Sequence, residues 1–275
     1  MDINEKQNVI NAQSFFCPAL DKVVGYPLQP KRIVSLVPSQ TELLYDLGLD
    51  GEVLGITKFC IHPNEWFRNK TRIGGTKNID IEKIRALGPD LIIANKEENV
   101  KEQIWALETV APVWVTDVNN LEDALEMIEM IGTLVGRKQK AERLTEQINL
   151  RFTQSPTPNP QLRTCYLIWR EPYITIGGDT FIHDMMKRCG LRNVFESGTR
   201  YPTIDIEQIK DSNCELVLLS SEPYPFKEKH INELRSPIPA SKFLLADGEM
   251  FSWYGSRLLK AVDYFSALQK QISSL

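Results

Sequence analysis

Four short segments of the sequence place aromatic rings beside Pro, Gly or Arg, each directly after a run of residues that predicts a β-strand. Aromatic faces and fixed arginines suit a large flat ligand that carries carboxylate or phosphate groups. The alternative is that the rings only close the ends of a sheet. Because the segments gather in the second half of the chain, they favour a ligand pocket. They are 169–173 (WREPY), 201–202 (YP), 222–226 (EPYPF) and 252–257 (SWYGSR).

Cys60 and His62 stand two positions apart on a predicted loop that follows a strand. In an extended loop both side chains would face the same way, where they could ligate a metal, including the metal of a bound chelate. A buried packing role is the alternative, and so short a pattern favours it. His183 lies in a helical pattern and is predicted to be structural, whereas His230 lies in a charged loop and is predicted to be solvated.

The sequence patterns of common enzyme classes are absent: it has no P-loop, no GxSxG, no HExxH and no strand-linked GxGxxG. The turn at 177–180 precedes a predicted helix and could bind an anion through backbone N–H groups, although a capped turn needs no ligand. Catalysis would have to use Cys60 with His62, or Arg170 with Glu171. Neither pair supplies a nucleophile, a base and an orienting group, so we expect binding without chemistry.

A repeat shows how these residues are organised. The sequence IDIEKI at 79–84 returns as IDIEQI at 204–209, and the register continues without a gap from 90–93 to 215–218. A repeat at so long an interval does not belong to a solenoid. It therefore predicts two lobes of one architecture.

In both copies an aspartate, Asp80 or Asp205, is predicted to cap a helix. This places Glu82 and Glu207 in the first turn, where the helix dipole favours a carboxylate. Acidic residues are common at helix starts, but two equivalent glutamates on similar lobes could also present a matched pair of charges.

Apolar runs alternate with helical periodicities along most of the chain, which predicts parallel sheets. From 121 to about 152 the helical period continues without Pro, so we expect one long helix there, eased at Gly132 or Gly136 and ended by the Pro-rich segment 155–160. The predicted strands are 32–37, 53–56, 91–94, 113–115, 164–169, 174–176, 216–220 and 243–245, and the other predicted helices are 40–47, 81–87, 181–189, 206–210 and 255–272.

The predicted fold is therefore α/β, with two lobes of mainly parallel sheets flanked by helices and joined by one long α-helix. Its predicted parts are an N-terminal lobe over residues 1–118, the connecting helix over 119–154 and a C-terminal lobe over 155–275.

The bulk composition excludes several classes of partner. The chain has 275 residues, 42% hydrophobic and 25% charged, and a net charge of −4, which gives no electrostatic case for binding nucleic acid or an anionic membrane. Its five cysteines share no CxxC spacing, so neither a disulfide framework nor a structural zinc site is expected. Residues 1–8 lack an apolar signal region and no apolar run is long enough to span a bilayer. The expected location is cytoplasmic as the sequence stands, or periplasmic if a leader has been removed.

The segment 30–42 (PKRIVSLVPSQTE), followed by 79–84 and by 88–94 (GPDLIIA), resembles the helical-backbone class of ABC-importer substrate-binding proteins. The resemblance extends from about Asp21 over nearly the whole chain and is strongest with the cobalamin-binding branch. It implies a periplasmic-binding-protein-like fold and a monomer without catalytic activity. It also implies that cobalamin, another corrinoid, haem, a siderophore or another metal chelate is held between the lobes and delivered to an ABC permease.

The resemblance also assigns residues. In the cobalamin-binding branch a glutamate of each lobe docks onto the permease, and the matching positions are Glu82 and Glu207. Thr76 stands where that branch has an aromatic residue. A cytosolic carrier or sensor of such a chelate remains the alternative, which the missing leader favours, and an enzyme is less favoured. The predicted ligand-binding residues are Phe59, Thr76, Trp169, Arg170, Tyr173, Tyr201, Trp253, Tyr254 and Arg257, with His62 as a candidate metal ligand.

Overall fold

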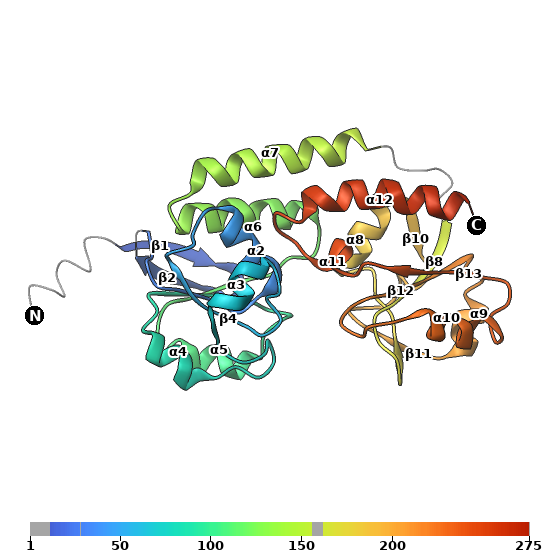
Figure 1. Ribbon diagram of the computed structural model, residues 1–275, viewed down its shortest axis with the longest axis horizontal. Helices are drawn as coiled ribbons and strands as arrows, with labels where there is room; N and C mark the ends of the chain where they lie inside the picture. Colours follow the sequence, from blue (N-terminus) through green and yellow to red (C-terminus); the bar gives the residue numbers. More distant parts are fainter. Residues whose placement is uncertain (1–11, 28, 156–161, 275) are drawn as a thin grey trace, which may run out of the picture. The chain divides into compact units, whose positions relative to one another are not determined.

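The computed structural model describes residues 12–27, 29–155 and 162–274 (Figure 1). Predictions for residues 1–8 and for 156–160 fall outside these ranges. The chain forms two compact units, and it passes between them several times. Unit 1 holds the residues through Val118, Asp123–Glu146 and Tyr254–Arg257, and unit 2 holds Asn119–Glu122, Gln147–Trp253 and Leu258–Leu275.

Unit 1 is built on a five-stranded parallel sheet in the order β5-β4-β3-β6-β7. Every residue of β3, β6 and β7 is buried, which requires cover on both faces of the sheet, as is usual for parallel strands. The strands predicted for this half are confirmed. The elements are β3 (Ile33–Ser35), α2 (Pro38–Asp46), β4 (Val53–Ile56), α3 (Asn64–Asn69), β5 (Thr71–Arg72), α4 (Ile81–Leu87), β6 (Leu91–Asn95), α5 (Lys101–Leu107) and β7 (Val113–Thr116).

An antiparallel hairpin that the sequence did not predict packs against β7, the edge strand of this sheet. It consists of β1 (Ala12–Cys17), the short helix η1 (Pro18–Leu20) and β2 (Lys22–Pro27). The Cys17 thiol donates to the carbonyl of Val115 at 3.3 Å, and the Tyr26 hydroxyl donates to that of Val113 at 3.2 Å. Side-chain donors thereby satisfy outward-facing carbonyls of the edge strand.

Unit 2 repeats the plan on a smaller scale, with a parallel sheet in the order β10-β8-β12-β13. Its core on one side of the sheet is formed by side chains such as Leu167, Val217 and Phe226. No helix in the described ranges is long and apolar enough to cross a membrane. The elements are β8 (Leu162–Leu167), β9 (Tyr173–Ile174), α8 (Phe181–Arg188), β10 (Leu191–Asn193), β11 (Thr203–Ile204), α9 (Ile206–Asp211), β12 (Leu216–Ser220), α10 (Glu228–Arg235), β13 (Lys242–Ala246), α11 (Glu249–Ser252) and α12 (Leu258–Ser273).

The prediction of one long connecting helix is wrong. The segment forms two helices, α6 (Leu121–Leu134) and α7 (Lys138–Gln154), which lie side by side in Figure 1. Gly136 takes a left-handed conformation at φ +68°, which ends the first helix because few other residues adopt it. A Cβ atom on Gly132 would lie 2.2 Å from that of Ala141, so the close packing of the two helices requires glycine there.

The sequence repeat is confirmed as a structural repeat. Asp80 accepts a hydrogen bond from the Lys83 backbone at the start of α4, and Asp205 accepts the equivalent bond from Gln208 at the start of α9. This bond stabilises the charged form of Asp80 and lowers the pKa of its carboxyl. Each helix then leads into a central strand, β6 or β12.

An arginine fastens the end of each repeated helix. The Arg32 guanidinium donates to the carbonyls of Gly88 at 2.7 Å and of Leu87, and in unit 2 Arg163 donates to those of Asn213 at 3.2 Å and of Ser212. The last carbonyls of a helix lack partners within the helix itself. Arg32, directly before β3, and Arg163, within β8, supply these partners, so each repeat is held at both ends.

This arrangement predicts that Arg163→Ala will lower the free energy of unfolding by about 1–2 kcal/mol, since the hydrogen bonds come from a charged donor but are partly exposed. Urea denaturation would measure the loss. Arg143→Ala on α7 is the control, because Arg143 is exposed and should change stability by less than about 0.5 kcal/mol. Equal stability of the two variants would contradict the role of Arg163.

Candidate ligand-binding site

In open parallel sheets, ligands bind beyond the carboxyl ends of the strands, where successive crossovers leave a central strand in opposite directions. In unit 1 the strand β3 is central, with β4 and β5 on one side and β6 and β7 on the other. The switch point of unit 1 therefore lies between β3 and β6. We therefore expect the ligand-contacting residues of this unit in the segments that follow β3, β4 and β6.

The segment after β6 is fixed by a network of asparagine hydrogen bonds. Asn95 accepts from the backbone of Glu97 and Glu98, and its own backbone donates to Asn99 at 2.9 Å. The Asn99 amide in turn donates to the backbone carbonyl of Thr76 at 3.1 Å. The loop that carries Glu98 is therefore held in one conformation by groups at the ends of neighbouring segments.

Glu98 has an unusual environment within this loop. Its side chain forms no ion pair or hydrogen bond with any described residue, although it is partly buried. Burial raises the pKa of its carboxyl, and the positive charge of Lys77 offsets only part of this effect. Glu98 was not among the predicted site residues, although its position shortly after a central apolar strand is a signal that could have identified it.

Gln40, in the first turn of α2 after β3, is fully buried. Its amide nitrogen donates to the hydroxyl oxygen of Thr116. The Thr116 hydroxyl donates its own proton to the carbonyl of Ala94, at 3.1 Å. Because the Thr116 hydroxyl already donates to Ala94, it can only accept from Gln40. The amide nitrogen of Gln40 must therefore face Thr116, and the amide oxygen must face away from it. The Gln40 Oε1 atom has no donor in the described part of the chain.

The loop after β4 carries the predicted Phe59, Cys60 and His62. Phe59 is 50% exposed, whereas Cys60 is fully buried with its sulfur 3.1 Å from the Thr41 hydroxyl and 3.2 Å from that of Thr57. Burial raises the pKa of the Cys60 thiol, so it stays protonated near neutral pH and is a poor metal ligand. Across the described ranges, no three His, Cys, Asp or Glu side chains meet in a way that could hold a metal ion.

In unit 2 the switch point lies between β8 and β12, by the same reasoning. Trp169 follows β8 and is 40% exposed, and its ring meets that of Tyr224, which follows β12, edge-to-face with centroids 5.7 Å apart. Phe226 and His230 pack behind Tyr224 at 4.8 and 5.4 Å. The exposed indole is thus supported by a fixed aromatic cluster. The prediction that His230 is solvated is wrong, because it is buried and accepts from the backbone of Lys227.

Two further predicted residues of unit 2 are engaged internally. Arg170 binds the carboxylates of Glu233 at 2.8 Å and of Glu171 at 3.2 Å. Trp253 is buried, and its indole N–H donates to Glu222 at 2.9 Å. We therefore find Arg170 used in ion pairs rather than available to a ligand carboxylate, contrary to our expectation.

Arg257, which belongs to unit 1, departs from our expectation in the same way. Its guanidinium donates to both carboxylate oxygens of Glu42, at 2.7 and 2.9 Å, and both side chains are almost completely buried. A bidentate pair of this kind is specific in geometry. Arg257 therefore organises unit 1 and does not offer an exposed charge.

The predicted ligand-binding residues thus fall into an exposed group and a buried group. Phe59, Trp169 and Tyr201 present substantial exposed ring surface, at 50%, 40% and 39%, and Tyr173 is half-buried. Thr76, Trp253, Tyr254 and Arg257 are buried. The three exposed rings are the members best suited to stack on a ligand.

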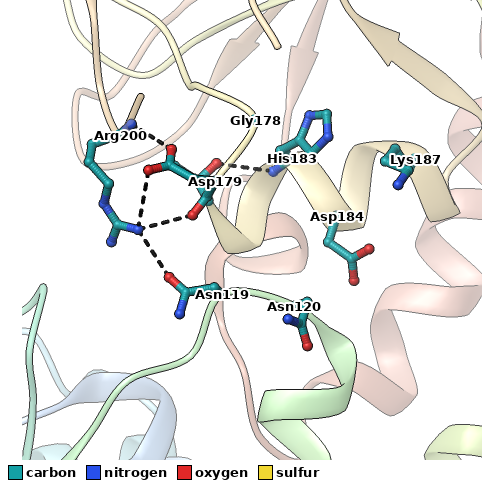
Figure 2. A pocket seen from close by; sticks show the side chains of 9 residues that line it. Asn119, Asn120, Gly178, Asp179, His183, Asp184, Lys187 and Arg200 are labelled. Carbon is teal, nitrogen blue, oxygen red and sulfur yellow. Dashed lines mark hydrogen bonds and ion pairs between the residues drawn. The ribbon is translucent and has the colours of Figure 1, made fainter. Parts of the chain in front are cut away.

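A hollow of about 400 Å³ lies at the start of α8 and is lined mainly by polar residues of unit 2. Figure 2 shows the side chains that line it. Arg200 bridges this region, donating to the side chain of Asn119 and to the carbonyl of Asp179, each at 3.0 Å. His183 lies on α8, where burial lowers the pKa of its imidazole and keeps it neutral near pH 7. None of the predicted ligand-binding residues lines the hollow, but Arg200 precedes the predicted Tyr201 in sequence and its guanidinium lies 6.0 Å from the centre of that ring.

Glu82 and Glu207, the predicted docking residues, are highly exposed, with side-chain exposures of 82% and 75%. Neither carboxylate is unpaired, however. Glu82 lies 3.6 Å from Arg85, and Glu207 lies 2.6 Å from Lys210, in each case one turn along the same helix. The two units therefore share the pairing as well as the position.

Each of the two parallel α/β units carries exposed aromatic rings in the segments between its strands and helices. The family model for periplasmic binding proteins matches residues 33–237, and this chain belongs to that family. Its members are binding proteins without catalytic activity.

Related proteins of known fold or name agree with this assignment. A vitamin B12-binding protein of Pectobacterium carotovorum is 25% identical over 239 residues, covering 84% of this chain and 86% of the relative. A periplasmic haem-binding protein of Roseiflexus sp. RS-1 superposes with a TM-score of 0.78 at 19% identity, covering 87% of this chain and 98% of the other. The periplasmic vitamin B12-binding protein of Vibrio cholerae superposes with a TM-score of 0.73 at 22% identity, covering 89% of this chain and 100% of the other. The structural matches establish the shared fold.

The buried ion pair predicts a large effect of removing one partner. Arg257→Met should destabilise unit 1 by roughly 3–5 kcal/mol, because it leaves the Glu42 carboxylate buried without its main counter-charge. Glu42→Leu combined with Arg257→Met should recover much of this loss. Thermal unfolding of the single and double variants would measure the coupling, and additive losses would contradict it.

Proposed function

We propose that this protein is the substrate-binding component of an ABC importer and that it binds a metal chelate or corrinoid without chemical change. Membership of the periplasmic binding protein family carries this proposal. The exposed rings of Phe59, Trp169 and Tyr201, which follow or adjoin the strand ends where ligands of such folds bind, support it. Vitamin B12 and haem, named for the relatives described above, are the ligand classes to test first.

Stacking is the interaction that the site offers most clearly. The Trp169 indole is supported by Tyr224, and the Arg200 guanidinium lies 6.0 Å from the centre of the Tyr201 ring. Rings held in place in this way lose little conformational freedom on binding, which favours affinity for a flat macrocycle.

Trp169→Ala and Tyr201→Ala are each expected to weaken ligand binding by about 1–3 kcal/mol, by analogy with the stacking of nucleic-acid bases on aromatic side chains. Calorimetric titration with cyanocobalamin and with haemin would measure the effect. Trp105→Ala is the matched control, because Trp105 is 51% exposed but lies within the helix α5 and not in a segment that follows a strand. If Trp105→Ala weakens binding as much as the other two, stacking at the switch points is refuted.

Glu82 and Glu207 are the proposed contacts to the permease. The double variant Glu82→Ala/Glu207→Ala should leave ligand affinity and melting temperature nearly unchanged, since an exposed first-turn acid contributes roughly 0.3–1 kcal/mol. It should abolish binding to the permease and uptake of the ligand. Reconstituted transport and pull-down of the permease would test this.

The control for this experiment is Glu102→Ala/Glu228→Ala, which removes one exposed first-turn glutamate from each unit at other helices. Delivery to an importer would place the protein outside the cytoplasmic membrane, whereas a carrier or sensor of the same chelate would act in the cytoplasm. Fractionation of the native host distinguishes the two, and uptake that is unaffected by the double variant would favour the carrier or sensor.

A further inference from the structure

The Glu98 carboxylate lies at the switch point of unit 1 without a partner. Its backbone N–H donates to Asn95 at 3.1 Å, but its side chain forms no ion pair or hydrogen bond with any described residue. A charged group that loses water without gaining a partner is destabilised, and burial accordingly raises the pKa of the Glu98 carboxyl. The asparagine network around Asn95 and Asn99 holds the loop in this conformation.

A second hydrogen-bond acceptor belongs to the same set of strand ends. Gln40 follows β3, the strand beside β6, and its fully buried Oε1 atom has no donor in the described ranges. Buried acceptors of this kind are rare in folded proteins. At the switch point of unit 1, two acceptors, the Glu98 carboxylate and the Gln40 Oε1 atom, therefore lack hydrogen-bond donors among the described residues.

The arginines that could have balanced a ligand carboxylate are already bound to acidic side chains. Arg170 pairs with Glu233 and Glu171, and Arg257 pairs with Glu42. Arg200, beside Tyr201, lies 3.9 Å from Asp179. These three arginines are therefore neutralised internally, and an anionic ligand gains little from them.

From this imbalance, and resting on the function proposed above, we propose that Glu98 contacts the bound ligand and determines its specificity. Its carboxylate accepts a hydrogen bond from an amide N–H, hydroxyl or ammonium group on the periphery of the chelate. The same carboxylate disfavours chelates whose periphery carries carboxylates. The ligand class is thus a neutral or cationic chelate rich in hydrogen-bond donors.

Glu98→Gln tests this role because it keeps the shape of the side chain and removes its charge. The probes are cyanocobalamin, whose periphery carries amide groups, and haemin, which carries propionates. We expect Glu98→Gln to weaken cyanocobalamin binding about 10-fold or more, since a hydrogen bond to a charged group is lost. Haemin binding should be unchanged or tighter, because the repulsion is removed. Tryptophan fluorescence titration and calorimetry would measure both affinities.

Glu97→Gln is the matched control, because it removes the same charge from the neighbouring residue and should leave the ratio of the two affinities unchanged. Glu98→Asp keeps the charge and should retain the preference for cyanocobalamin. Equal changes in both affinities, or none, in Glu98→Gln would overturn the role of Glu98 while leaving the proposed function intact. A preference of the unaltered protein for haemin over cyanocobalamin would also overturn the role of Glu98 and leave the proposed function intact. Binding of neither probe would reject both the proposed ligand classes and this inference.

Discussion

The ion pair between Glu42 and Arg257 is the constraint on which the organisation of this protein depends. Its partners stand near opposite ends of the sequence, yet both are buried in unit 1. The chain must therefore return to unit 1 after most of unit 2 has been built. Gly255 permits this return, since a Cβ atom there would lie 3.0 Å from the Ser39 carbonyl. As a result Trp253 and Tyr254, which are adjacent in sequence, belong to different units.

Features that depend on local chemistry could be predicted from the sequence. The caps at Asp80 and Asp205 are side chains bonding a backbone three residues ahead, so the residue types and their spacing suffice. The parallel sheets follow from apolar runs that alternate with helical periods. The repeat added the equivalence of the two units, and with it the equivalent positions of Glu82 and Glu207.

Features that depend on distant partners could not be predicted. The end of α6 depends on the left-handed conformation of Gly136 and on the packing of Gly132 against Ala141. From the sequence, the two glycines suggested only a local weakening of one continuous helix. Arg170 and Arg257 were predicted to contact the ligand because an acidic partner of each, Glu233 and Glu42, lies far away in sequence. Glu98 was overlooked for the opposite reason. From the sequence, a glutamate in a polar loop is expected to be solvated. Only the strand order shows that this loop lies at the centre of the sheet.

The hairpin formed by β1 and β2 has a consequence for association between chains. An edge strand normally exposes carbonyl and N–H groups that can pair with a strand of another molecule. On β7 the carbonyls of Val113 and Val115 already accept from Tyr26 and Cys17. The burial of Cys17 also keeps its thiol from solvent. The β1–β2 hairpin therefore occupies acceptors of β7 that a strand of a second molecule would need, which disfavours extension of the sheet between molecules at this edge.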